Sequence, residues 1–189
     1  MRLFVGVELS DEVRRLAAQV AGDLQRGLAK TLTARWVPSE NMHLTVRFIG
    51  HVPDDGVSAL LAALTPPLDV APFDIELGGC GRFPPRGAPR VLWIGLTKGL
   101  QPLAALHTEF NRRVAPLGHE PESKPFNAHL TLARVKDSRS SSARTVDEVF
   151  QSVRINRVRQ RVETATIFES RLSPRGSHYT ALSHVPLRG

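Results

Sequence analysis

One stretch of eight residues occurs twice in this chain, and the repeat constrains the fold more than any other feature. Residues 43–50 read HLTVRFIG, and residues 129–136 read HLTLARVK. The two histidines lie 129 − 43 = 86 positions apart, which is close to half of the 189 residues. This spacing predicts a single domain, residues 1–189, made of two intertwined lobes with one His-x-Thr motif in each.

Hydrophobic periodicity predicts both strands and helices. Residues 2–9 alternate as in a strand, and Ser10, followed by two acids, is typical of a helix N-cap. The helix that follows should bury the apolar residues spaced by three and four, which are Val13, Leu16, Ala17, Val20, Leu24 and Leu28. Further helices are expected from residue 54, over residues 100–117 and near residues 146–150.

Short strands account for much of the remaining chain. They are expected at residues 34–37, 43–50, 72–77, 91–96, 126–135, 162–172 and 178–185, and the first two of these should pair with each other. The order of elements leaves few places for parallel crossovers. It therefore predicts an α+β fold in which two antiparallel sheets face a central cleft, with the helices on the outside.

Composition narrows the class of protein. Lys and Arg number 25 against 18 Asp and Glu, and the net charge of +7 favours an anionic partner such as nucleic acid. On composition alone, a generally soluble basic protein is an equal alternative. Cys80 is the single cysteine, so no intramolecular disulfide can form and a reducing, cytoplasmic location is expected. No secretory signal and no apolar run of roughly 18 residues is visible, so we expect no membrane partner. We also expect a monomer.

The repeated motif predicts a set of chemical groups on one surface. In a strand, residues i and i+2 point to the same side, so His43 and Thr45 share one face. His129 and Thr131 repeat that arrangement. A single His-x-Thr carries little information, but two copies that share His-Leu-Thr-aliphatic are hard to obtain by chance in a chain with seven histidines. We therefore expect two imidazoles and two hydroxyls to face one cleft.

This set of groups suits the hydrolysis of a phosphodiester. One histidine can take a proton from water while the other gives a proton to the departing oxygen. The threonine hydroxyls can donate to the phosphoryl oxygens, and Arg134 or Arg47 can add a charge-assisted contact. Arg134 lies three positions beyond Thr131, so it reaches the same face only if the strand has a bulge or ends there.

Other chemistries have less support in the sequence. The histidines form no His-Glu-x-x-His pair and neither motif contains an acidic residue, so no metal and no other cofactor is expected. Cys80 has no neighbouring base in the sequence, and no Gly-x-Ser-x-Gly elbow occurs. Residues 78–87, rich in glycine, proline and arginine, can lie against a ligand or form an ordinary hairpin connection.

Taken together, the residues resemble the 2H phosphoesterases, and among them the RNA 2′,3′-cyclic phosphodiesterases, also called 2′-5′ RNA ligases. Besides the two octets, the resemblance rests on RLFVGV at 2–7, RWVP at 35–38, GRFP at 81–84 and the ending ES-x-L-x-P-x-G-x-x-Y at 169–179. It implies a bilobal fold with pseudo-twofold symmetry. It also implies metal-free, ATP-independent opening of RNA or nucleotide 2′,3′-cyclic phosphates to 2′-phosphates, and it allows reversible 2′-5′ ligation.

The resemblance also implies roles for individual residues. His43 would act as general acid and His129 as base, although the near symmetry of the two motifs allows the reverse order. Thr45, Thr131 and Arg134 would hold the phosphate, and Arg47 can join these binding groups. Phe83 or Trp36 can stack a base, and a core position is an equal alternative for Trp36.

Two other functions remain open at this point. A non-catalytic module that holds RNA or nucleotides in the same basic cleft predicts salt-dependent binding without turnover. Alternatively, the same fold can act on a different substrate, such as an ADP-ribose cyclic phosphate or a 2′-5′ oligoadenylate.

Overall fold

The chain folds into one strongly curved antiparallel sheet with helices packed on it. The computed structural model describes residues 1–122, 125–138, 142–173 and 176–189. In these ranges the strands are β1 (Arg2–Glu8), β2 (Thr33–Trp36), β3 (His43–His51), β4 (Phe73–Phe83), β5 (Val91–Lys98), β6 (Leu130–Asp137), β7 (Arg159–Val162), β8 (Thr164–Ser173) and β9 (Gly176–Pro186). They are hydrogen-bonded in the order β7-β4-β5-β6-β3-β1-β8-β9, with β2 paired to β6 outside this path.

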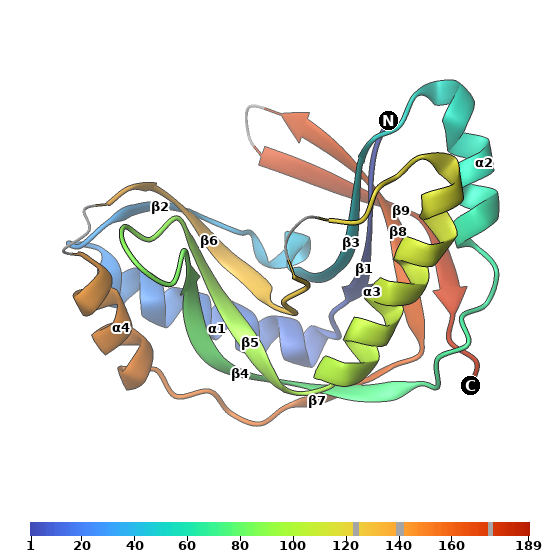
Figure 1. Ribbon diagram of the computed structural model, residues 1–189. Coiled ribbons are helices and arrows are strands. Elements are labelled where there is room, and N and C mark those ends of the chain that lie inside the picture. Colours follow the sequence, from blue (N-terminus) through green and yellow to red (C-terminus); the bar gives the residue numbers. More distant parts are fainter. Residues whose placement is uncertain (123–124, 139–141, 174–175) are drawn as a thin grey trace.

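The sheet consists of two four-strand arms that meet at one residue pair. Leu44 of β3 faces Leu130 of β6, and this is the single pair formed between the two central strands within the described residues. From it, one arm runs β3-β1-β8-β9 and the other runs β6-β5-β4-β7. The antiparallel α+β prediction is thus confirmed, with one difference: the two expected sheets are joined into one, which curves around the space between its arms (Figure 1).

The helices cover the outer side of the arms, and two of them pack on the opposite arm from the strand that they follow. They are α1 (Asp11–Leu28), α2 (Asp54–Leu64), α3 (Leu100–Val114) and α4 (Ser142–Ser152), with short 3-10 turns η1 (Ser39–Asn41) and η2 (Ala115–Leu117). Helix α1 follows β1 but packs on β6 and α4, while α3 follows β5 but packs on β3 and α2 (Figure 1). Each arm is therefore covered by a helix that follows a strand of the other arm.

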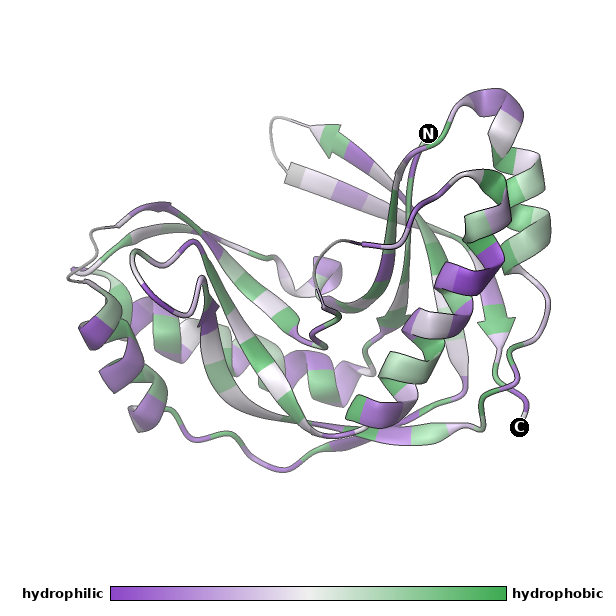
Figure 2. Cartoon of the chain, in the orientation of Figure 1, coloured by the Kyte–Doolittle hydropathy of each residue, from purple (hydrophilic) through white to green (hydrophobic). Residues whose placement is uncertain are grey.

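The first helix forms as its sequence predicts. The Ser10 Oγ accepts a hydrogen bond from the Val13 backbone N–H at 3.3 Å, which caps the helix. All six residues of the predicted apolar face are buried, together with Ala21. The helices carry alternating hydrophilic and hydrophobic bands, as expected when one face packs on a sheet (Figure 2). No helix in the described ranges is long and apolar enough to cross a bilayer.

The predicted pairing of residues 34–37 with residues 43–50 is wrong. Strand β2 instead pairs with β6, where Arg35 lies opposite Arg134 and Trp36 lies opposite Ala133. The physical reason is the junction between the arms. Strand β6 shares one residue pair with β3, so the backbone groups beyond that pair need another partner, and β2 supplies it.

Strands β1 and β3 approach each other closely at Gly6. A Cβ at this position would lie 2.9 Å from the Leu44 carbonyl oxygen and 3.4 Å from Cδ2 of His43. The carbonyl oxygen belongs to the backbone of the central strand, which cannot move aside as a side-chain tip can. Gly6 is therefore needed where β1 supports the first motif.

We expect Gly6→Ala to lower the free energy of unfolding by about 1–3 kcal/mol, because the added methyl group overpacks the strand pair. Urea denaturation measures this change. Gly22→Ala is a matched control, since Gly22 lies inside α1 and its nearest neighbour is the flexible end of Arg26, at 3.4 Å. That variant should gain about 0.5–1 kcal/mol from helix propensity. Equal effects of the two substitutions would contradict the close approach at Gly6.

Candidate active site

The two histidines are brought together by the junction of the arms. His43 is the first residue of β3, and His129 directly precedes β6. His43 and Thr45 flank Leu44, and His129 and Thr131 flank Leu130. Because side chains alternate along a strand, all four lie on the face opposite to the two buried leucines. The two motifs therefore meet on one face of the sheet.

Backbone carbonyls fix the orientation of both imidazole rings. Nδ1 of His43 lies 2.9 Å from the Asn41 carbonyl oxygen, and Nδ1 of His129 lies 2.7 Å from that of Asn127. A carbonyl oxygen can only accept, so Nδ1 must carry the proton in each ring. In the neutral form, Nε2 is then the free base on both histidines. The two motifs thus present the same nitrogen for proton transfer.

Aromatic side chains enclose each ring. His43 packs against Phe4 and Tyr179, with ring centroids 4.7 and 5.0 Å apart. His129 meets the edge of Phe83 at 5.0 Å. The aromatic neighbours of His43 were missed by sequence reasoning. Parity could have found Phe4, which points opposite to the core residues beside it in β1, but Tyr179 becomes a neighbour only through the pairing of strands β1, β8 and β9.

The environment makes both histidines weaker bases than free imidazole. Burial lowers the pKa of His43, against a smaller opposing effect of its hydrogen bond to Asn41. Burial also lowers the pKa of His129, where the Asn127 carbonyl opposes the shift and the positive charge of Arg134 adds to it. Both rings therefore favour the neutral form near pH 7 in the absence of an anion, so Nε2 is available to accept a proton.

The hydroxyl of Thr45 is already engaged with its own histidine. Its Oγ1 lies 3.1 Å from Nε2 of His43, and with Nδ1 protonated the hydroxyl donates to that nitrogen. Among the described residues, Nε2 of His129 has no such partner. The two motifs therefore share a backbone design but differ in how Nε2 is occupied.

A bulge in each motif strand solves the parity problem of Arg134. On β5, the neighbours Trp93 and Leu92 pair with Thr131 and Ala133, so Leu132 is an extra residue in β6. Beyond this bulge, alternation resumes with Arg134 on the same side as Thr131. Arg134 is exposed there, and its charge acts on His129. The structure thus brings Arg134 to the site.

The same bulge sends Arg47 away from the site. On β1, Gly6 and Val5 pair with Thr45 and Arg47, so Val46 is the extra residue and Arg47 turns inward. Arg47 is 3% exposed, and its guanidinium donates to the carbonyl oxygens of Phe48 and Glu120. It is not brought together with the histidines. Its contacts instead hold the segment that leads toward the second motif.

Aligning the two octets explains this difference. Without any gap, Arg47 occupies the place of Ala133, while Phe48 occupies the place of Arg134. Phe48 is 38% exposed, and the Arg2 guanidinium lies over its ring at 5.1 Å. The two arginines that follow the motifs in sequence are therefore not equivalent in space.

An open pocket of about 920 Å³ lies against this set of groups. Thr45 and His129 line it, and Phe83 contributes to its apolar wall with prolines of the β4–β5 connection and of the segment before β6. Phe83, Pro84 and Pro85 are the residues of the segment 78–87 that border this pocket. Trp36 packs against the hydrophobic core instead, so the core position is the one observed.

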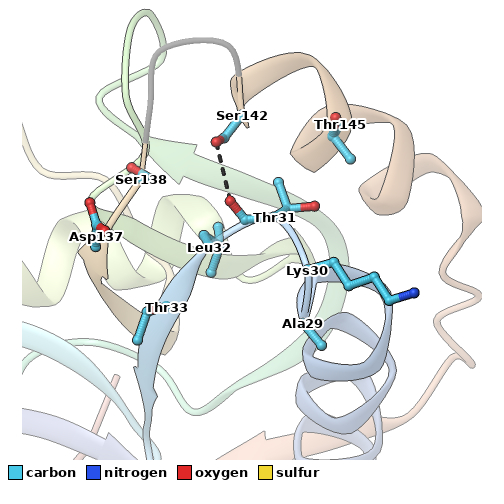
Figure 3. A pocket seen from close by; sticks show the side chains of 9 residues that line it. All are labelled: Ala29, Lys30, Thr31, Leu32, Thr33, Asp137, Ser138, Ser142 and Thr145. Carbon is cyan, nitrogen blue, oxygen red and sulfur yellow. Dashed lines mark hydrogen bonds between the residues drawn. The ribbon is translucent and has the colours of Figure 1, made fainter.

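A second pocket, of about 460 Å³, lies at the far end of β6 (Figure 3). It is lined by short polar side chains, and Ser142 at the start of α4 donates a hydrogen bond to the Thr31 carbonyl oxygen at 3.3 Å. The Lys30 side chain extends away from Asp137 and Ser138 (Figure 3). This pocket contains neither histidine of the repeated motif, so we assign the chemistry to the larger pocket.

A metal centre and a reactive cysteine are the other arrangements that could carry chemistry. Within the described ranges, no three His, Cys, Asp or Glu side chains are placed to hold a metal ion together. Burial raises the pKa of the Cys80 thiol to about 11, so it stays protonated at neutral pH and is a poor nucleophile.

Comparison with known proteins agrees with this geometry. An RNA 2′,3′-cyclic phosphodiesterase of Thermus thermophilus is 33% identical over 100% of this chain and 91% of its own length. A protein of the same name from Thermotoga maritima is 27% identical over 100% of this chain and 97% of its own. The crystal structure of the protein TT0787 of Thermus thermophilus superposes with a TM-score of 0.77 at 30% identity, covering 100% of this chain and 99% of that one.

The match extends to a whole protein family. Residues 8–171, which include both His-x-Thr motifs and all of the strands from β2 to β7, match the family described as the 2′-5′ RNA ligase superfamily. The chain therefore belongs to the 2′-5′ RNA ligase superfamily.

Proposed function

We propose that this protein hydrolyses RNA or nucleotide 2′,3′-cyclic phosphates to 2′-phosphates. The observation that carries the proposal is the junction of the two arms, which brings both His-x-Thr motifs to one face of the sheet. Both rings offer Nε2 for proton transfer, and Thr45 and His129 line one open pocket. The relatives named RNA 2′,3′-cyclic phosphodiesterase support the choice of substrate.

The reaction divides between an acid and a base. In our proposal, Nε2 of neutral His129 takes a proton from water as the water oxygen attacks phosphorus. The bond from phosphorus to the 3′ oxygen breaks on the opposite side, and protonated His43 gives its Nε2 proton to that oxygen. The products are a 3′-hydroxyl and a 2′-phosphate. The charge of Arg134 supports this order, because it disfavours the imidazolium form of His129.

Three further side chains would hold the phosphate during the reaction. Thr45 and Thr131 can donate hydroxyl hydrogen bonds to phosphoryl oxygens, and Arg134 can add a charge-assisted bond as negative charge builds up. Phe83 offers an aromatic surface in the pocket for the terminal base. The proposal requires neither a metal nor another cofactor.

Reversible 2′-5′ ligation, a monomeric state and a cytoplasmic location remain predictions. Ligation would use the same residues with the roles of acid and base exchanged, as microscopic reversibility requires. The lone cysteine favours a reducing compartment.

Purified protein treated with EDTA should convert cytidine 2′,3′-cyclic phosphate to the 2′-phosphate, which chromatography against both phosphate isomers identifies. His43→Ala and His129→Ala should each lower kcat by about 100- to 10,000-fold, because each removes one proton-transfer group. His51→Ala is the control, since His51 is exposed at the other end of β3 and should keep full activity.

The same assay separates the proposal from its main alternative. A module that only binds nucleotides would retain the cyclic phosphate unchanged and show salt-dependent binding. Formation of the 3′-phosphate, or loss of activity that returns with added metal, would contradict the proposed reaction.

The pH dependence of kcat/KM should show which histidine is the base. Because both pKa values are lowered, both limbs of the profile for the free enzyme should lie below the ordinary histidine value of about 6.5. The base must be neutral, so it produces the acidic limb, and the acid must be protonated, so it produces the alkaline limb.

Arg134→Gln tests the assignment. Removing the positive charge should raise the pKa of His129 and move the acidic limb to higher pH, while kcat/KM falls by about 10- to 100-fold through the lost phosphate contact. If the alkaline limb moves instead, His129 is the acid and the proposed order is reversed. The pH profile of Arg188→Gln, which removes the same charge from an exposed position near the C-terminus, serves as a comparison.

A further inference from the structure

Two arginines lie side by side on neighbouring strands next to the proposed site. Arg35 of β2 is directly opposite Arg134 of β6 in an antiparallel register. Directly opposite residues point to the same face, and both side chains are exposed. Ala34 and Trp36, the neighbours of Arg35, pack against the core, so Arg35 points to the opposite side, the side of Arg134. Arg35 therefore extends the row of His129, Thr131 and Arg134 by one strand.

The pair is unfavourable without an anion. Like charges directly opposite each other on a sheet are destabilising, with Cβ atoms about 4.5–5.5 Å apart. No acidic side chain in the described part of the chain forms an ion pair with either arginine, although Arg47, Arg82 and Arg113 all have acidic partners. Local rules of this kind are broken mainly at functional sites. The arrangement suits a bound polyanion.

A third arginine, Arg90, lies just before β5 and lines the same pocket. Val91 of β5 is paired with Arg134, and the residue before it, Arg90, is exposed and lines the 920 Å³ pocket. Arg90 forms no ion pair within the described ranges either. Because Val91 shares the face of Arg134 and side chains alternate along a strand, Arg90 turns to the other face. It adds positive charge at the pocket but is not part of the Arg35–Arg134 pair.

We propose that Arg35 binds the phosphodiester that precedes the terminal nucleoside of an RNA strand. The inference rests on the proposed function, because it takes Arg134 as the group that holds the reacting phosphate. Arg35 lies one strand farther from His129 than Arg134 does, so its guanidinium addresses a second phosphate. The protein then acts preferentially on RNA ends of two or more nucleotides over mononucleotide cyclic phosphates.

The experiment compares two substrates that end in the same nucleoside 2′,3′-cyclic phosphate, cytidine 2′,3′-cyclic phosphate and a dinucleotide with one additional upstream phosphodiester. Arg35→Gln should lower kcat/KM for the dinucleotide by about 10-fold, the effect of one charge-assisted hydrogen bond. The ratio of kcat/KM for the dinucleotide to kcat/KM for the mononucleotide should fall by nearly the same factor, because the mononucleotide lacks the second phosphate. For the dinucleotide, the slope of log kcat/KM against the logarithm of the salt concentration should also become shallower by about 0.7.

Two controls accompany the variant. Arg188→Gln removes the same charge from an exposed position near the C-terminus, beside Leu68. It should leave the ratio of kcat/KM for the dinucleotide to kcat/KM for the mononucleotide unchanged. A fall as large as that of Arg35→Gln would attribute the effect to net charge. Thermal unfolding of Arg35→Gln should show an unchanged or higher Tm, since one member of a like-charge pair is removed. A lower Tm would indicate a structural role.

Two outcomes would overturn the inference. An equal fall for both substrates places Arg35 at the reacting phosphate, and no fall for either shows that the pair is merely solvated. If the wild-type protein hydrolyses neither substrate, the proposed function fails. Calorimetric binding of a dinucleotide that ends in a 2′-phosphate, compared between the wild type and Arg35→Gln, then decides the Arg35 site by itself.

Discussion

The fold and the site both depend on one antiparallel contact, the pairing of Leu44 with Leu130. Both leucines are fully buried, and burying a leucine side chain contributes about 1.5–3 kcal/mol. Because side chains alternate along a strand, burying these two residues turns the flanking histidines and threonines to the opposite face. Hydrophobic burial at the junction therefore fixes the relative positions of the polar groups, and no direct bond between the two motifs is needed.

The bulges that follow this contact decide which later side chains belong to the site. Each motif strand gains one residue after its threonine, at Val46 and Leu132, and each resumes its alternation one position later. The bulge places Arg134 beside His129, and on the other strand it buries Arg47. A local change of one residue thus separates two arginines that look alike in the sequence.

The sequence predicted those features that depend on local pattern, namely the buried face of α1, the antiparallel α+β class and the pairing of His with Thr on one face. It failed where the result depends on which strands meet. The partner of β2, the joining of the sheets and the enclosure of His43 by Tyr179 all arise from contacts between distant segments. The burial of Arg47 could have been read from a gapless alignment of the octets, since its counterpart is the apolar Ala133.

The two motifs differ in the charge at one matching position, and this difference bears on the proposed roles of the two histidines. A phosphate bound between the histidines would favour the imidazolium form of both, because an opposite charge stabilises it. On the His129 side, Arg134 counteracts that effect, whereas the equivalent position on the His43 side holds the uncharged Phe48. Arg134 thus opposes protonation of His129 by a bound anion, and the His43 motif has no such charge at the matching position. In the proposed reaction, this difference would help two motifs of nearly identical sequence to supply one acid and one base. The difference is set by the single residue that follows each bulge by two positions.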